Sequence, residues 1–215
     1  MTLTFDDLPG LRPALRDVLS RPAPPARGGL PGLGAPSAYA FTPDPRLRAR
    51  RVADTAALMA RENPAGAQAL GEADVFGALD EAMGANGLSV NDLADVLGSY
   101  LGQLWELANG AARDASAARL GALARQARAV LDANMTDAQR GEPRALQTLA
   151  DALSVQNFVY GVTAFRLTQD WRDRTQELAG HYDQLGQDLL GLKLRLFTCD
   201  ENGLVTRTPD AYAAG

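Results

Sequence analysis

The sequence predicts an all-α fold: an irregular helical bundle of five or six helices around a central buried helix at about residues 88–109, with a short extended or hairpin segment near the C-terminus. Three observations support this prediction. Apolar residues recur every three or four positions over most of the chain, which is the spacing of one helix face. Clusters of Asn, Asp, Gly and Pro, residues that begin and end helices, separate these segments. Strand-like alternation is confined to residues 192–197.

The composition fits one globular domain. The 215 residues are 46% hydrophobic and 22% charged, with a net charge of −5, and this length is enough for a single core. Binding to nucleic acid or to anionic membranes needs clustered positive charge, so we expect neither partner. No stretch approaches the ~20 apolar residues that a membrane-spanning helix needs. All but one of the basic residues are arginine, so a single arginine says little about function.

The first forty residues are predicted to stand apart from the helical domain. Residues 1–21 form an N-terminal segment with a possible short helix. Residues 22–40 have the composition of a linker, since proline and glycine dominate and no period persists. The glycines there lack the Gly-Lys-Ser/Thr sequence of a phosphate loop. A single helical domain then covers residues 41–208, and residues 209–215 are a tail.

Shorter helices are expected between residues 41 and 88. Prolines at positions 43 and 45 fit the first turn of a helix that runs to about Glu62. Asn63-Pro64 and Asp74 each have the composition of a new helix start. The residues that the first helix is expected to bury are Leu47, Val52, Ala56 and Met59. Its arginines form either a solvated face with local ion pairs or a patch for an anionic ligand.

The stretch from Leu88 to Gly110 is predicted to be the central helix. Ser89 followed by Asp92 has the layout of a capping box, which would start a helix at Ser89. Asn109-Gly110 would end it in the left-handed conformation. The apolar positions follow helical spacing and are Val90, Leu93, Ala94, Leu97, Leu101, Leu104, Trp105 and Ala108. The opposite, polar side is predicted to face water or an interface.

A strip of small residues runs along this helix. Ala94, Gly98 and Gly102 recur every fourth position, and two glycines inside a helix cost about 1 kcal/mol each relative to alanine. We therefore expect a second helix, of this chain or of a partner, to pack closely here. Tyr100 and Trp105 lie beside the strip. They are either core residues or the aromatic floor of a shallow groove for a partner helix or an apolar ligand.

The C-terminal part of the chain completes the bundle. Helical periods cover residues 116–133, about 137–170 and about 170–191, and Gly141, Pro143 and Gly161 are positions where the long middle run can break. The alternation after residue 191 and the turn-forming residues 200–203 then predict a small hairpin.

Residue types that support catalysis or metal binding are scarce. His181 is the only histidine and Cys199 the only cysteine, so no intrachain disulfide and no multi-histidine metal site can form. An activated nucleophile would depend on these two residues. We therefore predict no catalytic residue, no metal site and no cofactor. Carboxylate pairs are the remaining option for acid–base chemistry, and the acids concerned are Asp80, Glu81, Asp92, Asp95 and Glu106.

Several positions resemble an uncharacterised bacterial family of helical domains. They are Phe41-Thr42-Pro43, Leu93-Ala94-Asp95, Tyr100, Trp105, Asn109-Gly110, and Gly191-Leu192 with Leu194, and the likeness covers about residues 41–205. Members usually carry a secretion signal and a Gly/Pro-rich stretch before the domain, so the resemblance implies an exported protein. We expect a periplasmic or secreted protein if a signal peptide preceded Met1, and a cytoplasmic one otherwise. The family has no assigned activity, so it implies no catalytic residue.

These observations support three functional hypotheses. The leading one is a non-enzymatic helical interaction or scaffold module of the bacterial cell envelope, which binds an unidentified protein or a second copy of itself. Its candidate surface is Ala94, Gly98, Tyr100, Gly102 and Trp105, with Asp92, Asp95 and Asn109 as candidate polar positions. The alternative is a carrier or sensor that holds an apolar small molecule between helices. The third is a hydrolase that uses carboxylates only.

Overall fold

A computed structural model describes residues 11–19, 21–25, 37–110 and 116–207. Within these ranges the chain forms nine α-helices and one antiparallel pair of strands, which confirms the predicted all-α fold with a C-terminal hairpin. The helices are α1 (Leu11–Leu19), α2 (Pro45–Met59), α3 (Pro64–Glu72), α4 (Val75–Gly84), α5 (Leu93–Ala108), α6 (Ala117–Asn134), α7 (Asp137–Arg140), α8 (Pro143–Gln169) and α9 (Thr175–Leu190). The strands are β1 (Phe197–Asp200) and β2 (Gly203–Thr206).

The chain is divided more finely than the five or six helices predicted, because several breaks have their own N-cap. The side chains of Asn63 and Asp74 each accept a hydrogen bond from the backbone N–H three residues later, at 2.9 and 3.0 Å. These caps start α3 and α4 separately. Thr136 starts the short α7 with a capping box. By contrast, α8 continues through Gly161 for 27 residues.

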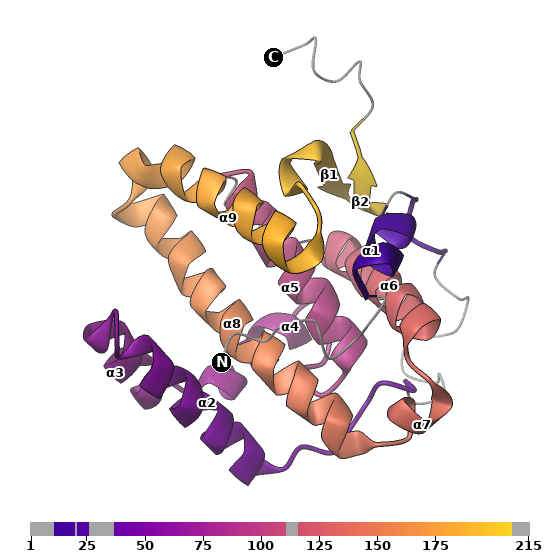
Figure 1. The fold of residues 1–215 in the computed structure, drawn as a ribbon, viewed down its shortest axis with the longest axis horizontal. Coiled ribbons are helices and arrows are strands. Elements are labelled where there is room, and N and C mark those ends of the chain that lie inside the picture. Colours follow the sequence, from indigo (N-terminus) through magenta and orange to yellow (C-terminus); the bar gives the residue numbers. More distant parts are fainter. Residues whose placement is uncertain (1–10, 20, 26–36, 111–115, 208–215) are drawn as a thin grey trace.

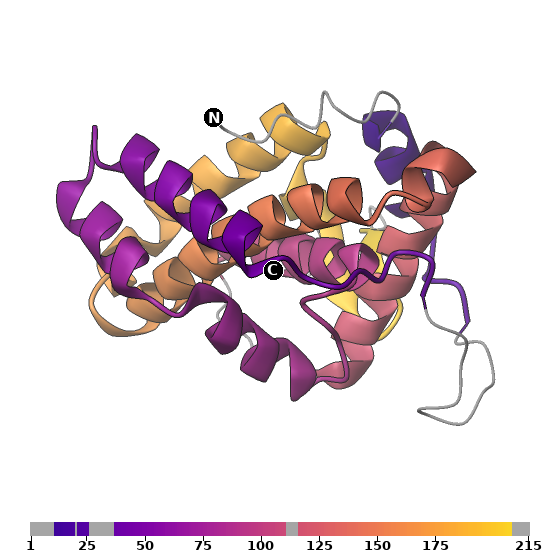
Figure 2. The ribbon, with the colours of Figure 1, turned by 90° about the horizontal axis from the view of Figure 1, so that it is seen from below.

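Helix α5 is the centre of the structure, as predicted. Helices α6, α8 and α9 pack around it (Figure 1), and the view from below shows α5 enclosed by its neighbours (Figure 2). Thirteen of its 16 residues are buried. The three that are not, Asp95, Ser99 and Gln103, are partly exposed and lie along one side of the helix, which is the polar side predicted to face water or an interface. The other sides of α5 belong to the core.

The helix starts four residues later than predicted. Its N-cap is Asp92, whose Oδ1 accepts hydrogen bonds from the backbone N–H groups of Ala94 (2.8 Å) and Asp95 (3.2 Å). Ser89 instead forms a local turn, in which its Oγ accepts from the N–H of Asn91 at 3.1 Å. The capping-box prediction at Ser89 is therefore wrong.

The reason for the late start is a pairing between segments that are distant in sequence. The N–H of Phe41 donates to the carbonyl of Asn91 at 2.9 Å, and the N–H of Leu93 donates to the carbonyl of Tyr39 at 3.1 Å. An isolated bridge between Ala40 and Asp92 accompanies these bonds, and the N–H of Asp92 closes a turn by donating to the carbonyl of Ser89 at 3.2 Å. Backbone groups that are satisfied in this way do not need a helix there.

Helices α2 and α3 form an arm on the outer side of α8, with α4 below it (Figures 1 and 2). None of the residues of α2 is buried. The prediction that this helix buries its apolar stripe is therefore wrong, because Val52, Ala56 and Met59 are only partly covered and pack against the edge of the core. We call residues 45–72 the α2–α3 arm; α3 contributes its buried residues, Ala67 and Leu70.

The C-terminal hairpin is fastened to the central helices. Phe197 pairs with Thr206 and Asp200 with Gly203. The indole N–H of Trp105 in α5 donates to the carbonyl of Phe197 at 2.9 Å. The buried amide of Gln126 in α6 both donates to the carbonyl and accepts from the N–H of Leu204, each at 2.9 Å. Helix α1 lies beside α6 and β2 at the same end of the molecule (Figure 1).

The predicted linker ends against the core. Tyr39 is buried, and its hydroxyl donates to Asp132 at 2.5 Å. Ala23 donates its N–H to the carbonyl of Asn202 at 2.7 Å. Residues 1–10, 26–36 and 208–215, which contain most of the predicted linker and the predicted tail, lie outside the described residues. Among the described helices, none combines the length and the apolar character needed to cross a bilayer.

Candidate functional site

The five residues predicted as a partner surface lie in the core. Ala94 and Tyr100 are fully buried, and Gly98, Gly102 and Trp105 are nearly so. The helix that packs on the small-residue strip is α6 of the same chain. A Cβ atom added to Gly98 would lie 2.6 Å from the backbone nitrogen of Ala124. The close approach was thus predicted correctly, but it occurs within one molecule. Of the five residues, Gly102 lines the groove described below, while Ala94, Gly98, Tyr100 and Trp105 are packed in the core.

The two aromatic residues have structural contacts. The ring of Tyr100 lies 5.7 Å from that of Tyr160 in α8, which lies 5.4 Å from that of Tyr182 in α9. Burial raises the pKa of Tyr160 to about 12 and that of Tyr100 well above its ordinary value. These phenols therefore stay protonated and act as packing residues. Trp105 holds the hairpin through the bond described above.

The three predicted polar positions also stabilise the fold. Asn109 donates from Nδ2 to the carbonyl of Trp105 (2.9 Å) and accepts at Oδ1 from Arg207 (2.9 Å), so it ties α5 to the end of the hairpin. Asp92 caps α5. Asp95 accepts from the backbone N–H of Ser89 at 3.0 Å and lies 3.8 Å from the guanidinium of Arg128. None of the three faces an open groove described below.

Asp95 should make stability depend on pH. Burial, followed by the neighbouring Asp92 charge, raises the pKa of Asp95 from 3.8 to about 6. Because this folded-state pKa lies above the unfolded one, the native protein binds more protons between about pH 4 and 6, and its free energy of unfolding falls as the pH rises through that window. The free energy of unfolding of Asp95→Asn, measured with urea and expressed relative to wild type, should therefore be about 1–3 kcal/mol higher at pH 7.5 than at pH 4.

The exposed Asp80→Asn variant controls for the loss of one negative charge in this comparison. Parallel pH profiles for wild type and Asp95→Asn would contradict the prediction.

The other groups considered for catalysis are exposed to solvent, form an ion pair or are kept protonated by burial. Asp80 and Glu81 are exposed on α4, and Glu106 forms an ion pair with Arg119. Burial raises the pKa of the Cys199 thiol to about 12, which keeps it protonated and unreactive. His181 is exposed on α9. No cluster of three or more potential metal ligands exists among the described residues.

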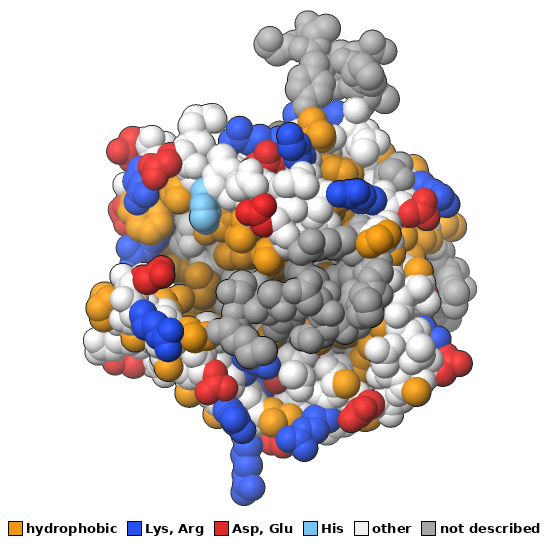
Figure 3. Space-filling view, viewed as in Figure 1, with side chains coloured by type: hydrophobic (Ala, Val, Ile, Leu, Met, Phe, Trp, Pro, Cys, Tyr) orange, Lys and Arg blue, Asp and Glu red, His pale blue; other side chains and the backbone are white. Residues whose placement is uncertain are grey.

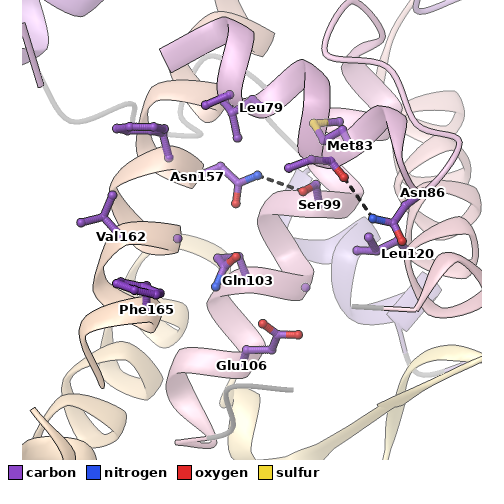
Figure 4. Close-up of a pocket in the computed structure, with 15 residues that line it drawn as sticks. Leu79, Met83, Asn86, Ser99, Gln103, Glu106, Leu120, Asn157, Val162 and Phe165 are labelled. Atoms are coloured by element: carbon purple, nitrogen blue, oxygen red, sulfur yellow. Dashed lines mark hydrogen bonds between the residues drawn. The ribbon is translucent and has the colours of Figure 1, made fainter. Parts of the chain in front are cut away.

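An open groove that is lined by both apolar and polar side chains lies between α4, α5 and α8 (Figure 4). This groove, which we call the amide groove, has a volume of about 430 Å³. Its apolar walls are Leu79, Met83, Leu120, Phe158, Val162 and Phe165. Its polar side chains include Ser99, Gln103 and Asn157, which lie close together between α5 and α8 in Figure 4. A mostly apolar groove with a few convergent polar groups is typical of ligand sites.

Asn157 carries the polar chemistry of this groove. Its side chain is 5% exposed, and its Nδ2 donates to the hydroxyl of Ser99 at 2.9 Å. Its Oδ1 has no hydrogen-bond partner among the described residues. Exchanging the amide oxygen and nitrogen would still leave one of the two without a partner. An unsatisfied buried polar atom costs about 1–3 kcal/mol, so a group with a complementary donor would be held here.

Gly161 keeps one wall of the groove open. It lies in the middle of α8, and a Cβ atom added to it would meet no atom within 4 Å. A helix-interior glycine costs about 0.5–1 kcal/mol relative to alanine. No close approach among the described residues accounts for this glycine, unlike Gly98. It leaves space in the amide groove that a side chain would occupy.

The rim of the groove is apolar and exposed. Phe165 is 66% exposed and Val162 is 44% exposed. Neither residue is among the predicted surface and polar candidates, which all lie in the stretch from Leu88 to Gly110. Phe158, Val162 and Phe165 are spaced at i, i+4 and i+7, and this apolar stripe of α8 was the available signal. Figure 3 shows basic and acidic side chains interspersed over one face of the molecule.

No family model, curated protein or solved structure matches the chain. The interpretation of the site therefore rests on its own geometry.

Proposed function

We propose that the protein is a non-enzymatic binding protein that holds a small, mostly apolar molecule in the amide groove. The observation that carries the proposal is the buried Oδ1 of Asn157, an acceptor without a donor inside an apolar groove. Gly161 supports it, because the open wall has no packing role within the chain. The volume of about 430 Å³ lies within the ~300–1,000 Å³ typical of small-molecule sites.

The chemistry of the groove restricts the class of ligand. The apolar walls favour a hydrocarbon or aromatic body, since burying apolar surface gains about 25 cal/mol per Å². Asn157 favours an N–H or O–H group on that body. Glu106 also lines the groove, but Arg119 neutralises it, so the groove does not demand a charged ligand. An alcohol, a phenol or a secondary amide fits this description.

Filling the groove should abolish ligand binding without unfolding the protein. Gly161→Phe places a side chain in the open wall, and Gly180→Phe is its matched control, because Gly180 is also a helical glycine with no atom within 4 Å of an added Cβ. In native mass spectrometry of protein purified from its own host, wild type and Gly180→Phe should carry a bound small molecule that denaturation releases. Gly161→Phe should carry none, and Asn157→Leu should retain less of it.

Wild-type protein that carries no small molecule, or equal retention by Gly161→Phe, would contradict the proposal. Copurification of a protein that Gly161→Phe releases would instead favour the second candidate.

The second candidate is a helical interaction module that binds a partner helix over Val162 and Phe165. The exposure of these two side chains favours it, since large apolar residues at a groove rim are common at protein interfaces. The resemblance to an exported family is the reason to propose an envelope location for either function. Cell fractionation with sequencing of the native N-terminus tests that location, and an unprocessed cytoplasmic protein would contradict it.

A further inference from the structure

A second groove lies beside the amide groove, between α8 and α3 of the α2–α3 arm. It has a volume of about 490 Å³. Its apolar lining includes Met59, Ala69, Leu70, Val159 and Val162. Three further residues of α3 and its ends, Ala65, Gly66 and Ala73, are small and leave the groove wide. Met59 is the one residue of α2 in this lining, so α2 does not fill the space.

One end of this arm groove is cationic. Arg166 lines it together with Trp171, and the guanidinium Cζ of Arg166 lies 5.4 Å from the centre of the Trp171 ring. Arg174 lies against the same ring at 5.5 Å, but it is paired with Glu177 at 3.2 Å. Arg166 forms no ion pair with a carboxylate among the described residues. The groove therefore ends at a positive charge that has no counterion within the described part of the chain.

We propose that the arm groove binds a free fatty acid, with the hydrocarbon chain under the arm and the carboxylate at Arg166. A guanidinium can bind a carboxylate through two parallel hydrogen bonds, and the apolar lining matches an unbranched chain. The charge sits at one end while the lining is mostly apolar, which fits a molecule with a single terminal anion. An acidic peptide would place polar backbone groups against Leu70, Val159 and Val162, whose side chains cannot form hydrogen bonds with them.

This inference is independent of the amide groove, although the two grooves share Phe158 and Val162. Gly161 lines only the amide groove and Ala69 only the arm groove, so a bulky residue at each position blocks one groove at a time. The chain has two tryptophans, Trp105 and Trp171. Trp105 is buried, does not line the arm groove, and donates its indole N–H to the carbonyl of Phe197. A change in tryptophan fluorescence on binding would therefore report Trp171.

The experiment is a calorimetric and fluorescence titration of the full chain with dodecanoate below its micelle concentration. We expect one site per chain, with about tenfold or greater weakening in Arg166→Gln, because a charge-assisted bond is lost. Arg144→Gln, which removes an arginine from the opposite end of α8, should bind like wild type. Dodecanol should bind wild type and Arg166→Gln equally. Ala69→Phe should block binding, and Gly161→Phe should not.

Absence of dodecanoate binding, or wild-type affinity in both Arg166→Gln and Ala69→Phe, would overturn the proposal. Loss of binding in Gly161→Phe but not in Ala69→Phe would assign the fatty acid to the amide groove and also overturn it. Binding to phosphatidylglycerol vesicles without binding to free dodecanoate would overturn it in favour of a membrane surface. Circular dichroism of each variant checks folding, and if Arg166→Gln unfolds, Ala69→Phe decides the outcome.

Discussion

Replacing Gly98 with leucine should leave the protein unfolded at 25 °C. Even the Cβ atom would lie 2.6 Å from the backbone nitrogen and 2.7 Å from the Cα atom of Ala124. Backbone atoms of a packed helix cannot move aside as a flexible side chain can, so α5 and α6 would have to separate. Overpacking by a methylene or two costs about 1–3 kcal/mol. Leucine adds three further heavy atoms beyond a Cβ that already clashes with backbone, so we expect its cost to exceed that range and to reach the ~5–15 kcal/mol by which whole domains are stable.

Gly98→Ala provides the graded measurement. We expect it to lower the free energy of unfolding by about 3 kcal/mol in urea denaturation. Gly161→Ala is the matched control, since its added methyl group meets open space, and it should raise the free energy of unfolding by about 0.5–1 kcal/mol. If Gly98→Leu kept its helical circular dichroism and instead lowered the mass in light scattering, the strip would be an interface between molecules.

Removing the positive charge of Arg119 should be the second most damaging change. Arg119 in α6 forms an ion pair with Glu106 of α5, and both side chains are buried. Taking one partner from a buried pair leaves an uncompensated charge, which costs about 3–5 kcal/mol. We therefore expect Arg119→Met to lose that amount in urea unfolding. The double variant Glu106→Gln with Arg119→Met should recover most of it.

An exposed ion pair provides the control for the comparison of these Arg119 and Glu106 variants. Arg50 and Asp54 lie 3.7 Å apart on the outer face of α2, and surface pairs of this kind contribute about 0–1 kcal/mol. Arg50→Met should therefore change stability very little. A loss below about 1 kcal/mol in Arg119→Met would mean that Glu106 does not depend on its partner.

The features that sequence predicted best are those set by local periodicity. The repeat from Leu93 to Ala108 identified the central helix, and Asn109-Gly110 correctly marked its end, with Gly110 at a positive φ of 61°. The start was misplaced because Tyr39 and Phe41, about 50 positions earlier, pair with the segment after Ser89. Such pairing leaves no local pattern.

The candidate site depended on which helices meet, and periodicity does not contain that information. The spacing of Gly98 and Gly102 correctly implied a close neighbour, but the sequence could not say whether that neighbour belonged to the same chain. In the sequence, the helical spacing around Asn157 does not distinguish it from a polar residue that faces water. Only the approach of α4 and α5 to α8 makes its carbonyl an acceptor without a donor. Gly161 was considered as a helix break, when its effect is to widen a groove.

The attachment of the hairpin to α5 has a consequence for how the protein is made. Trp105 and its acceptor Phe197 are 92 residues apart, and Gln126 and Leu204 are 78 apart. At about 5–20 residues per second, a ribosome needs roughly 5–20 s after making Trp105 to reach Phe197. After Trp105, α6 and α8, the main neighbours of α5, are made before α9 and the hairpin. The part of the apolar surface of α5 that these last elements cover therefore stays open until the end of the described chain has emerged, and a chaperone that shields apolar segments can bind it during that interval.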